Sequence, residues 1–256
     1  MLAIIGGSGL DQMPGLTIEH QQDVSTPYQS APVKLLVGTL SGSANTICFM
    51  PRHGEQNAVP PHRINYRANL YALHVLGATG VLAVNAVGGI TEKMGPGVIA
   101  IPDQIIDYTW GRDHTFFDGS KTDLQSSEKF SDTVAHIDFT DPYSAELREL
   151  LIDSAASLGI GVLNKGTYAA TQGPRLESAA EVQRMRRDGA DLVGMTGMPE
   201  AALARELGLP YACIALSVNW AAGIDDGVIT MEGILQVLSQ GMGDIQRILT
   251  VAVSGN

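Results

Sequence analysis

The sequence has few cysteines, few aromatic residues and a deficit of positive charge. Of its 256 residues two are cysteine and 5% are aromatic, and 16 Lys and Arg face 27 Asp and Glu, a formal net charge of −11. That balance disfavours a nucleic-acid partner, because phosphate backbones require clustered Lys and Arg. Cys48 and Cys213 lie in apolar runs without metal-ligand spacing, so we expect buried thiols and no bound metal.

Long apolar runs and leader-like segments are also missing. No run approaches the roughly 18 apolar residues of a membrane-spanning helix. Met1–Ile5 leads into a glycine-rich turn, with no basic segment followed by a long apolar one. We therefore expect a cytoplasmic protein without a membrane partner. Hydrophobic residues make up 45% of the chain, enough for a substantial core.

Short apolar runs and amphipathic segments alternate along the chain. Strands are expected at 2–5, 34–38, 45–51, 81–89, 98–102, 166–173, 191–196 and 211–219, and helices at about 65–76, 143–158, 178–187, 199–207 and from 230. Asp141 and Pro142 are predicted to open the second helix, and Ser178 with Glu181 has capping-box spacing. This alternation predicts a single α/β domain over 1–256, a three-layer α/β/α sandwich around a mixed, largely parallel sheet. The polar stretch 111–131 is expected to be a mobile or partner-contacting loop.

Six segments with polar or glycine-rich character each end a predicted strand. They are 4–10, 51–54, 84–89, 171–178, 193–200 and 217–223. Ligands of open α/β sheets bind at the carboxyl ends of strands, so we expect these segments to meet. The first fails the dinucleotide fingerprint because Gln12 holds its third glycine position, which leaves a phosphate-contacting turn or a purely structural one. Arg52 and His53 in the second either meet an anion or belong to a solvated loop.

The motifs GGSGL, RHG, INYRAN, VNAVGGI, PDQIIDYT, QGPRLES, DLVGMTGMPEA and SVNW occur in order over essentially the whole chain. Together they resemble the trimeric purine nucleoside phosphorylase family, and INYRAN resembles its methylthio-nucleoside branch. The resemblance implies a homotrimer, phosphorolysis of a nucleoside, inorganic phosphate as co-substrate and no cofactor. It assigns phosphate binding to Ser8, Arg52, His53, Asn85, Ala86 and Thr196. Among these, Ser8 and His53 are expected to be catalytic together with Asn219, the donor to the leaving purine.

The same resemblance assigns the nucleoside side of the site. Met195 would lie against the ribose, and His136 matches a residue that a neighbouring subunit contributes, unless it is a surface histidine. Met231 and Ile234 are candidates for lining a 5′-methylthio group, with ordinary core as the alternative. The remaining expected substrate contacts are Leu176, Glu177, Asn219, Trp220 and Ala221.

Base choice follows from hydrogen-bonding chemistry. Adenine-selective relatives carry Asp-x-Asp where this chain has Asn219-Trp220-Ala221, and Glu177 matches the acid that 6-oxopurine enzymes place against N1–H. A 6-oxopurine offers an acceptor at position 6, which suits the amide NH₂ of asparagine. We therefore expect phosphorolysis of S-methyl-5′-thioinosine. The alternatives are an inosine/guanosine or methylthioadenosine phosphorylase, with an oxidoreductase or a non-catalytic purine-binding protein as rivals from other classes.

Overall fold

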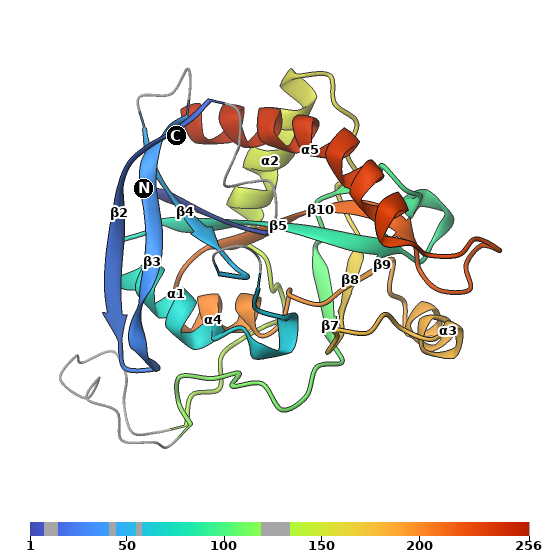
Figure 1. Ribbon diagram of the computed structural model, residues 1–256, viewed down its shortest axis with the longest axis horizontal. Helices are drawn as coiled ribbons and strands as arrows, with labels where there is room; N and C mark the ends of the chain where they lie inside the picture. Colours follow the sequence, from blue (N-terminus) through green and yellow to red (C-terminus); the bar gives the residue numbers. More distant parts are fainter. Residues whose placement is uncertain (8–14, 41–44, 55–57, 119–133, 256) are drawn as a thin grey trace.

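The computed structural model describes residues 1–7, 15–40, 45–54, 58–118 and 134–255. In these ranges a mixed sheet forms the middle layer, with α2 and α5 over one face and α1 and α4 over the other, which confirms the predicted α/β class (Figure 1). The helices are α1 (Tyr66–Val75), α2 (Ala145–Ser157), α3 (Ala179–Arg187), α4 (Glu200–Glu206) and α5 (Met231–Ser254). None of the helices in the described ranges has the length and apolarity needed to cross a membrane.

Ten strands form this sheet in the described part of the chain. They are β1 (Leu2–Gly6), β2 (Leu16–Thr26), β3 (Gln29–Leu40), β4 (Thr46–Pro51), β5 (Gly80–Gly89), β6 (Ile99–Ala100), β7 (Gln104–Asp107), β8 (Thr167–Ala170), β9 (Leu192–Gly194) and β10 (Tyr211–Trp220). Their order is β2-β3-β4-β1-β5-β9-β8-β7, and β10 pairs with β5 and β6. Parallel pairing joins β4, β1, β5 and β10, and also β7, β8 and β9, whereas the pairs β2–β3, β3–β4, β5–β9 and β6–β10 are antiparallel.

Strand β5 is the centre of the sheet, and one of its edges is divided between two neighbours. Strand β10 runs along one edge from Val81 to Gly89. On the other edge β1 pairs with 80–83 and β9 pairs with 88–89, so residues 84–87 have no strand neighbour there among the described residues. Ala86 is exposed within this otherwise buried strand. The interruption therefore opens a space beside the backbone at the centre of the sheet.

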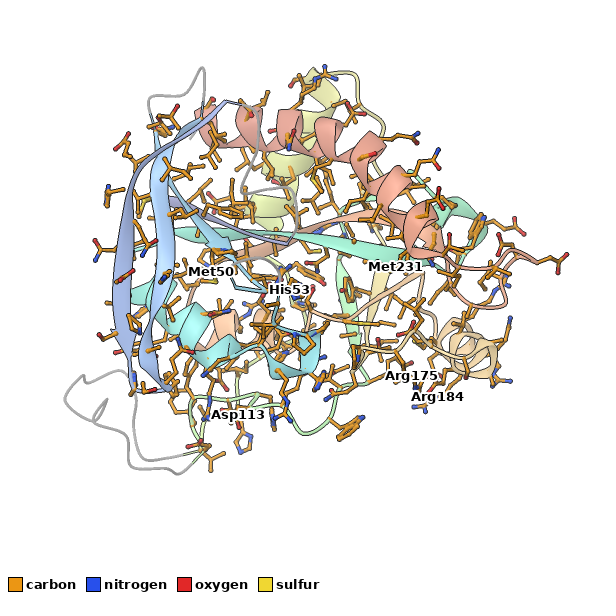
Figure 2. All side chains as sticks on the ribbon, in the orientation of Figure 1. Met50, His53, Asp113, Arg175, Arg184 and Met231 are labelled. Atoms are coloured by element: carbon orange, nitrogen blue, oxygen red, sulfur yellow. The ribbon has the colours of Figure 1, made fainter. Side chains whose placement is uncertain are left out.

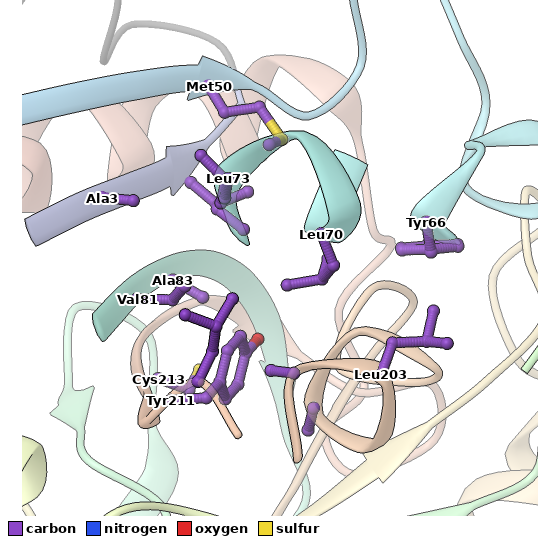
Figure 3. Close-up of a cluster of buried hydrophobic side chains, with 14 of the residues drawn as sticks. Ala3, Met50, Tyr66, Leu70, Leu73, Val81, Ala83, Leu203, Tyr211 and Cys213 are labelled. Carbon is purple, nitrogen blue, oxygen red and sulfur yellow. The ribbon is translucent and has the colours of Figure 1, made fainter. Parts of the chain in front are cut away.

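Side-chain alternation along the strands supplies both cores. In β1, Ala3 and Ile5 face the helices α1 and α4, and Leu2 and Ile4 face α2 and α5. Figure 3 shows the first core, where Leu73 of α1 lies near Met50 and Ala3. Because both faces of these strands are covered, they read in the sequence as continuous apolar runs.

The predicted helices and apolar strands are present, and the capping box of Ser178 and Glu181 is formed. Three details differ. Strand β2 was not expected, because most of its residues are polar and exposed, and its antiparallel pairing extends β3 well beyond the predicted 34–38. Strand β7 was also missed. Ser144 rather than Asp141 or Pro142 caps α2, since its hydroxyl accepts a hydrogen bond from the Leu147 N–H.

Candidate active site

A cavity of about 280 Å³ lies at the open edge of β5. Its walls come from the ends of β4, β9 and β10, from the loop after β8 and from the first turns of α5. Figure 2 places His53 near the middle of the molecule, where β4 ends, and Met231 where α5 begins. The cavity thus collects segments that are distant in the sequence, as the position of the six motifs predicts.

Eleven of the residues predicted for the site line this cavity. They are Arg52, His53, Asn85, Ala86, Leu176, Glu177, Met195, Thr196, Asn219, Ala221 and Ile234. Asn85 and Ala86 were expected at the end of a strand, but they lie within β5. They nevertheless lie just beyond the last residue that β1 pairs, Ala83, so the ligand edge of the sheet follows β1 rather than β5.

The other predicted residues lie elsewhere. Trp220 does not line the cavity, and its indole packs on Gly95. Met231 is 67% exposed and precedes the lining residue Ile234 by one turn. His136 is exposed on the surface, and Ser8 lies outside the described residues.

Arg52 is held by a buried carboxylate that the sequence analysis missed. Its Nε and Nη2 donate to Oε2 and Oε1 of Glu200, each at 2.8 Å, and Nη1 donates to the Val84 carbonyl at 2.9 Å. Glu200 is fully buried and also accepts a 2.8 Å hydrogen bond from the Tyr211 hydroxyl. Burial alone would lower the pKa of Arg52, but the Glu200 carboxylate raises it above its ordinary value. Of the five guanidinium N–H groups, two remain unused by the described residues.

His53 is oriented by the chain that follows it. Its Nδ1 lies 2.8 Å from the Val59 carbonyl, which can only accept, so Nδ1 carries a proton. Burial lowers the pKa of His53, and the charge of Arg52 lowers it further, against the Val59 hydrogen bond, which raises it. The ring is therefore neutral near pH 7, and its Nε2 edge faces Gly7 at the cavity wall as an acceptor. Such a ring suits an anion that itself carries a proton.

Asn85 and Thr196 face each other across the phenol of Tyr168. The Tyr168 oxygen is 3.5 Å from Asn85 Nδ2, and Thr196 lowers the pKa of Tyr168 against the larger effect of burial, which raises it. Asn85 is buried, and its Oδ1 has no hydrogen-bond partner in the described ranges. A Cβ at Gly194 would collide with the Tyr168 hydroxyl, so a glycine is required for the loop carrying Thr196 to pack this closely.

The same cavity wall also carries an acid, Glu177, and an amide, Asn219. Thr171 donates from Oγ1 to Glu177 Oε1 at 2.6 Å. Asn219 Nδ2 donates to the Trp220 carbonyl at 2.6 Å, which leaves its second N–H and its oxygen for a ligand. The strand is irregular between Ser217 and Asn219, and such a bulge re-aims the side chains that follow. The cavity therefore combines groups that can bind an anion, Arg52, His53 and Thr196, with the side chains of Glu177 and Asn219, which can hydrogen-bond a base.

A family model described as the phosphorylase superfamily matches residues 1–254. The chain belongs to the phosphorylase superfamily. This membership confirms the resemblance seen in the motifs and sets the class of enzyme, since the family's members are phosphorylases.

Relatives and solved structures agree over nearly the full length. A probable S-methyl-5′-thioinosine phosphorylase of Pseudomonas syringae pv. tomato is 49% identical over 99% of this chain and 98% of its own. The 6-oxopurine nucleoside phosphorylase of Pyrococcus furiosus is 42% identical over 98% of this chain and 91% of its own. The methylthioadenosine phosphorylase of Schistosoma mansoni in complex with adenine superposes with a TM-score of 0.87 at 31% identity, covering 98% of this chain and 90% of that one.

Two further buried residues of this phosphorylase were not foreseen. Tyr168 reads as an ordinary strand residue in the sequence. Arg112 falls in the segment expected to be a mobile or partner-contacting loop, yet it is buried and donates to the carbonyls of Thr171, Gln172 and Met195 at 2.8–3.0 Å. A mobile loop is therefore wrong for the start of that segment, because Arg112 ties it to the loops after β8 and β9, whereas contact with a partner stays a prediction. Residues 119–131 lie outside the described ranges.

Proposed function

We propose that the chain catalyses the phosphorolysis of S-methyl-5′-thioinosine to hypoxanthine and S-methyl-5-thio-α-D-ribose 1-phosphate, a purine salvage reaction. The observation that supports this most is the pairing of Glu177 and Asn219 in one cavity with Arg52, His53 and Thr196. An acid that accepts from N1–H and an amide whose free N–H is shared between O6 and N7 suit a 6-oxopurine. Arg52, His53 and Thr196 suit inorganic phosphate, the proposed co-substrate. The proposed reaction needs no cofactor. The name of the Pseudomonas syringae relative agrees with this choice.

The proposed reaction forms a bond from a phosphate oxygen to C1′ while the C1′–N9 bond breaks. The bonding electron pair leaves with the purine, which takes up a proton, and the sugar passes through a cation-like state. A phosphate held beside C1′ stabilises that state, provided its charge is not fully neutralised. Here Glu200 already balances the charge of Arg52, so Arg52 would orient the phosphate without cancelling its charge. Asn219 would donate to N7 as negative charge develops on the leaving base.

We further propose that the active enzyme is a cytoplasmic homotrimer whose subunits each consist of one domain, 1–256. The exposed His136 of one copy would reach the 5′ end of the nucleoside in the cavity of a second copy. Ser8, just after the cavity residue Gly7, would complete the phosphate site.

The proposed reaction is tested by incubating S-methyl-5′-thioinosine, S-methyl-5′-thioadenosine and inosine with the enzyme, with and without phosphate. Free base is measured by chromatography. We expect hypoxanthine from the thioinosine to form fastest and only when phosphate is present. Base release without phosphate would indicate hydrolysis, and a preference for the thioadenosine would contradict the role of Asn219. Equal turnover of inosine would favour the alternative of an inosine/guanosine phosphorylase.

The 5′ end of the substrate is tested with a matched pair of substitutions in α5. Ile234 lines the cavity, and Met231, one turn earlier, is exposed. We expect Ile234→Asn to lower kcat/KM for S-methyl-5′-thioinosine relative to inosine by about 10-fold or more, since mismatching one small apolar group is worth roughly 1–3 kcal/mol. Met231→Asn should leave this ratio unchanged. A larger effect at Met231 than at Ile234 would place the methylthio group outside the cavity described above.

A further inference from the structure

The carboxylate of Glu177 lies on a wall shared by two cavities. One is the 280 Å³ cavity of the proposed reaction, and the other, of about 360 Å³, is lined by Asp107, Trp110, Arg175 and Arg184. Figure 2 shows Arg184, a residue of α3, close to Arg175. Both arginines already have partners: Arg175 forms two 2.8 Å hydrogen bonds with Glu181, and Arg184 lies over the ring of Tyr108. Their positive charge nevertheless attracts the Glu177 carboxylate toward the second cavity.

Thr171 is the one described residue that hydrogen-bonds the Glu177 side chain. The distance from its Oγ1 to Glu177 Oε1 is 2.6 Å, whereas the Gly194 carbonyl is 3.3 Å away. A hydroxyl has a single proton, and the shorter contact shows that it is directed to the carboxylate, the stronger acceptor. This hydrogen bond uses Oε1 and leaves Oε2 without a partner among the described residues.

The backbone of Thr171 is itself fixed on both sides. Its N–H donates to the Gly194 carbonyl at 2.8 Å, and its carbonyl accepts from Arg112 Nη2 at 3.0 Å. Thr171 is 9% exposed and directly follows β8. The hydroxyl therefore acts from a rigid position, whereas Glu177 lies in a partly exposed loop.

We infer that Thr171 is a positioning residue for base selectivity, which holds Glu177 so that its free Oε2 accepts the N1–H of a 6-oxopurine. This inference rests on the proposed function. A 6-aminopurine carries a lone pair at N1, so an ionised carboxylate fixed in this position repels it. Thr171 thereby adds rejection of adenine nucleosides to recognition of hypoxanthine, without touching either base.

The test compares Thr171→Val, which keeps the shape and removes the hydroxyl, with Thr171→Ser, which keeps the hydroxyl. In the synthetic direction we expect Thr171→Val to raise the KM for hypoxanthine about 10-fold, the loss of one hydrogen bond to a charged group. In the phosphorolytic direction the KM for phosphate should stay within about 2-fold, because the groups that bind phosphate are not altered. Thr171→Ser should restore the wild-type KM for hypoxanthine to within about 3-fold.

The same substitution in a Glu177→Gln background shows whether Thr171 acts through the carboxylate. There Thr171→Val should have no further effect on the KM for hypoxanthine. An unchanged KM in Thr171→Val, a Thr171→Ser as impaired as Thr171→Val, or full additivity with Glu177→Gln would overturn the inference. If Thr171→Val does not fold, Thr171→Ala replaces it in the same comparison with Thr171→Ser. Failure of the wild-type enzyme to release hypoxanthine with phosphate would instead refute the proposed function.

Discussion

Replacing Glu200 by methionine is expected to lower the free energy of unfolding by about 3–5 kcal/mol, because it leaves the Arg52 guanidinium buried without a counter-charge. The pair is bidentate, and both side chains are almost wholly inaccessible to solvent. Removing the carboxylate also takes away the acceptor of the Tyr211 hydroxyl. Urea unfolding at one fixed protein concentration measures the change.

Two controls separate the buried charge from a general effect of mutation. Asp244→Asn breaks an exposed pair with Arg247, and it should cost less than about 1 kcal/mol. The double variant Arg52→Met with Glu200→Met removes both charges and should be more stable than Glu200→Met alone. A double variant no more stable than the single one would show that packing of Glu200, and not its charge, determines the loss. Phosphate-dependent activity should be lost in Glu200→Met, where Arg52 is displaced, and in the double variant, where Arg52 is absent.

The helices and the apolar strands could be predicted because each reflects a local pattern. The capping box at Ser178 needs only two residues three apart, and the stripe of α5 repeats at helical spacing. Strand β2 has no such pattern, because it is paired through its backbone and its side chains are largely exposed. An amphipathic period marks a strand only when one face of that strand is buried.

The site was predictable where its residues follow strands and not where partners come from distant segments. Arg52 and Glu200 are 148 residues apart, and an acid in the first turn of a helix is explained equally well by the helix dipole. Arg112 lies in a polar stretch, where an arginine normally indicates a solvated loop. Trp220 was grouped with its neighbours Asn219 and Ala221, but its indole packs on Gly95 outside the cavity. These outcomes depend on which elements meet in space, and no local pattern contains that information.

Asn219→Asp is expected to lower kcat/KM for S-methyl-5′-thioinosine by about 10²–10³-fold, the usual loss when a donor to developing charge is removed from an active site. Negative charge builds up on the five-membered ring as the C1′–N9 bond breaks, and an aspartate beside N7 opposes it. The amide is positioned for this role at the end of β10, where one of its N–H groups is held by the Trp220 carbonyl and the other remains available. Steady-state kinetics with saturating phosphate measures the loss.

The same variant tests base selectivity. An aspartate accepts the 6-amino group of adenine, so the ratio of kcat/KM for S-methyl-5′-thioadenosine to that for S-methyl-5′-thioinosine should rise by up to about two decades. Asn219→Ala is the matched control, because it removes the donor without adding an acceptor, and it should slow both substrates while raising the ratio less than Asn219→Asp does. An unchanged ratio in Asn219→Asp would exclude Asn219 from base choice. Selectivity would then depend on Glu177 alone, whose carboxylate accepts a hydrogen bond from Thr171.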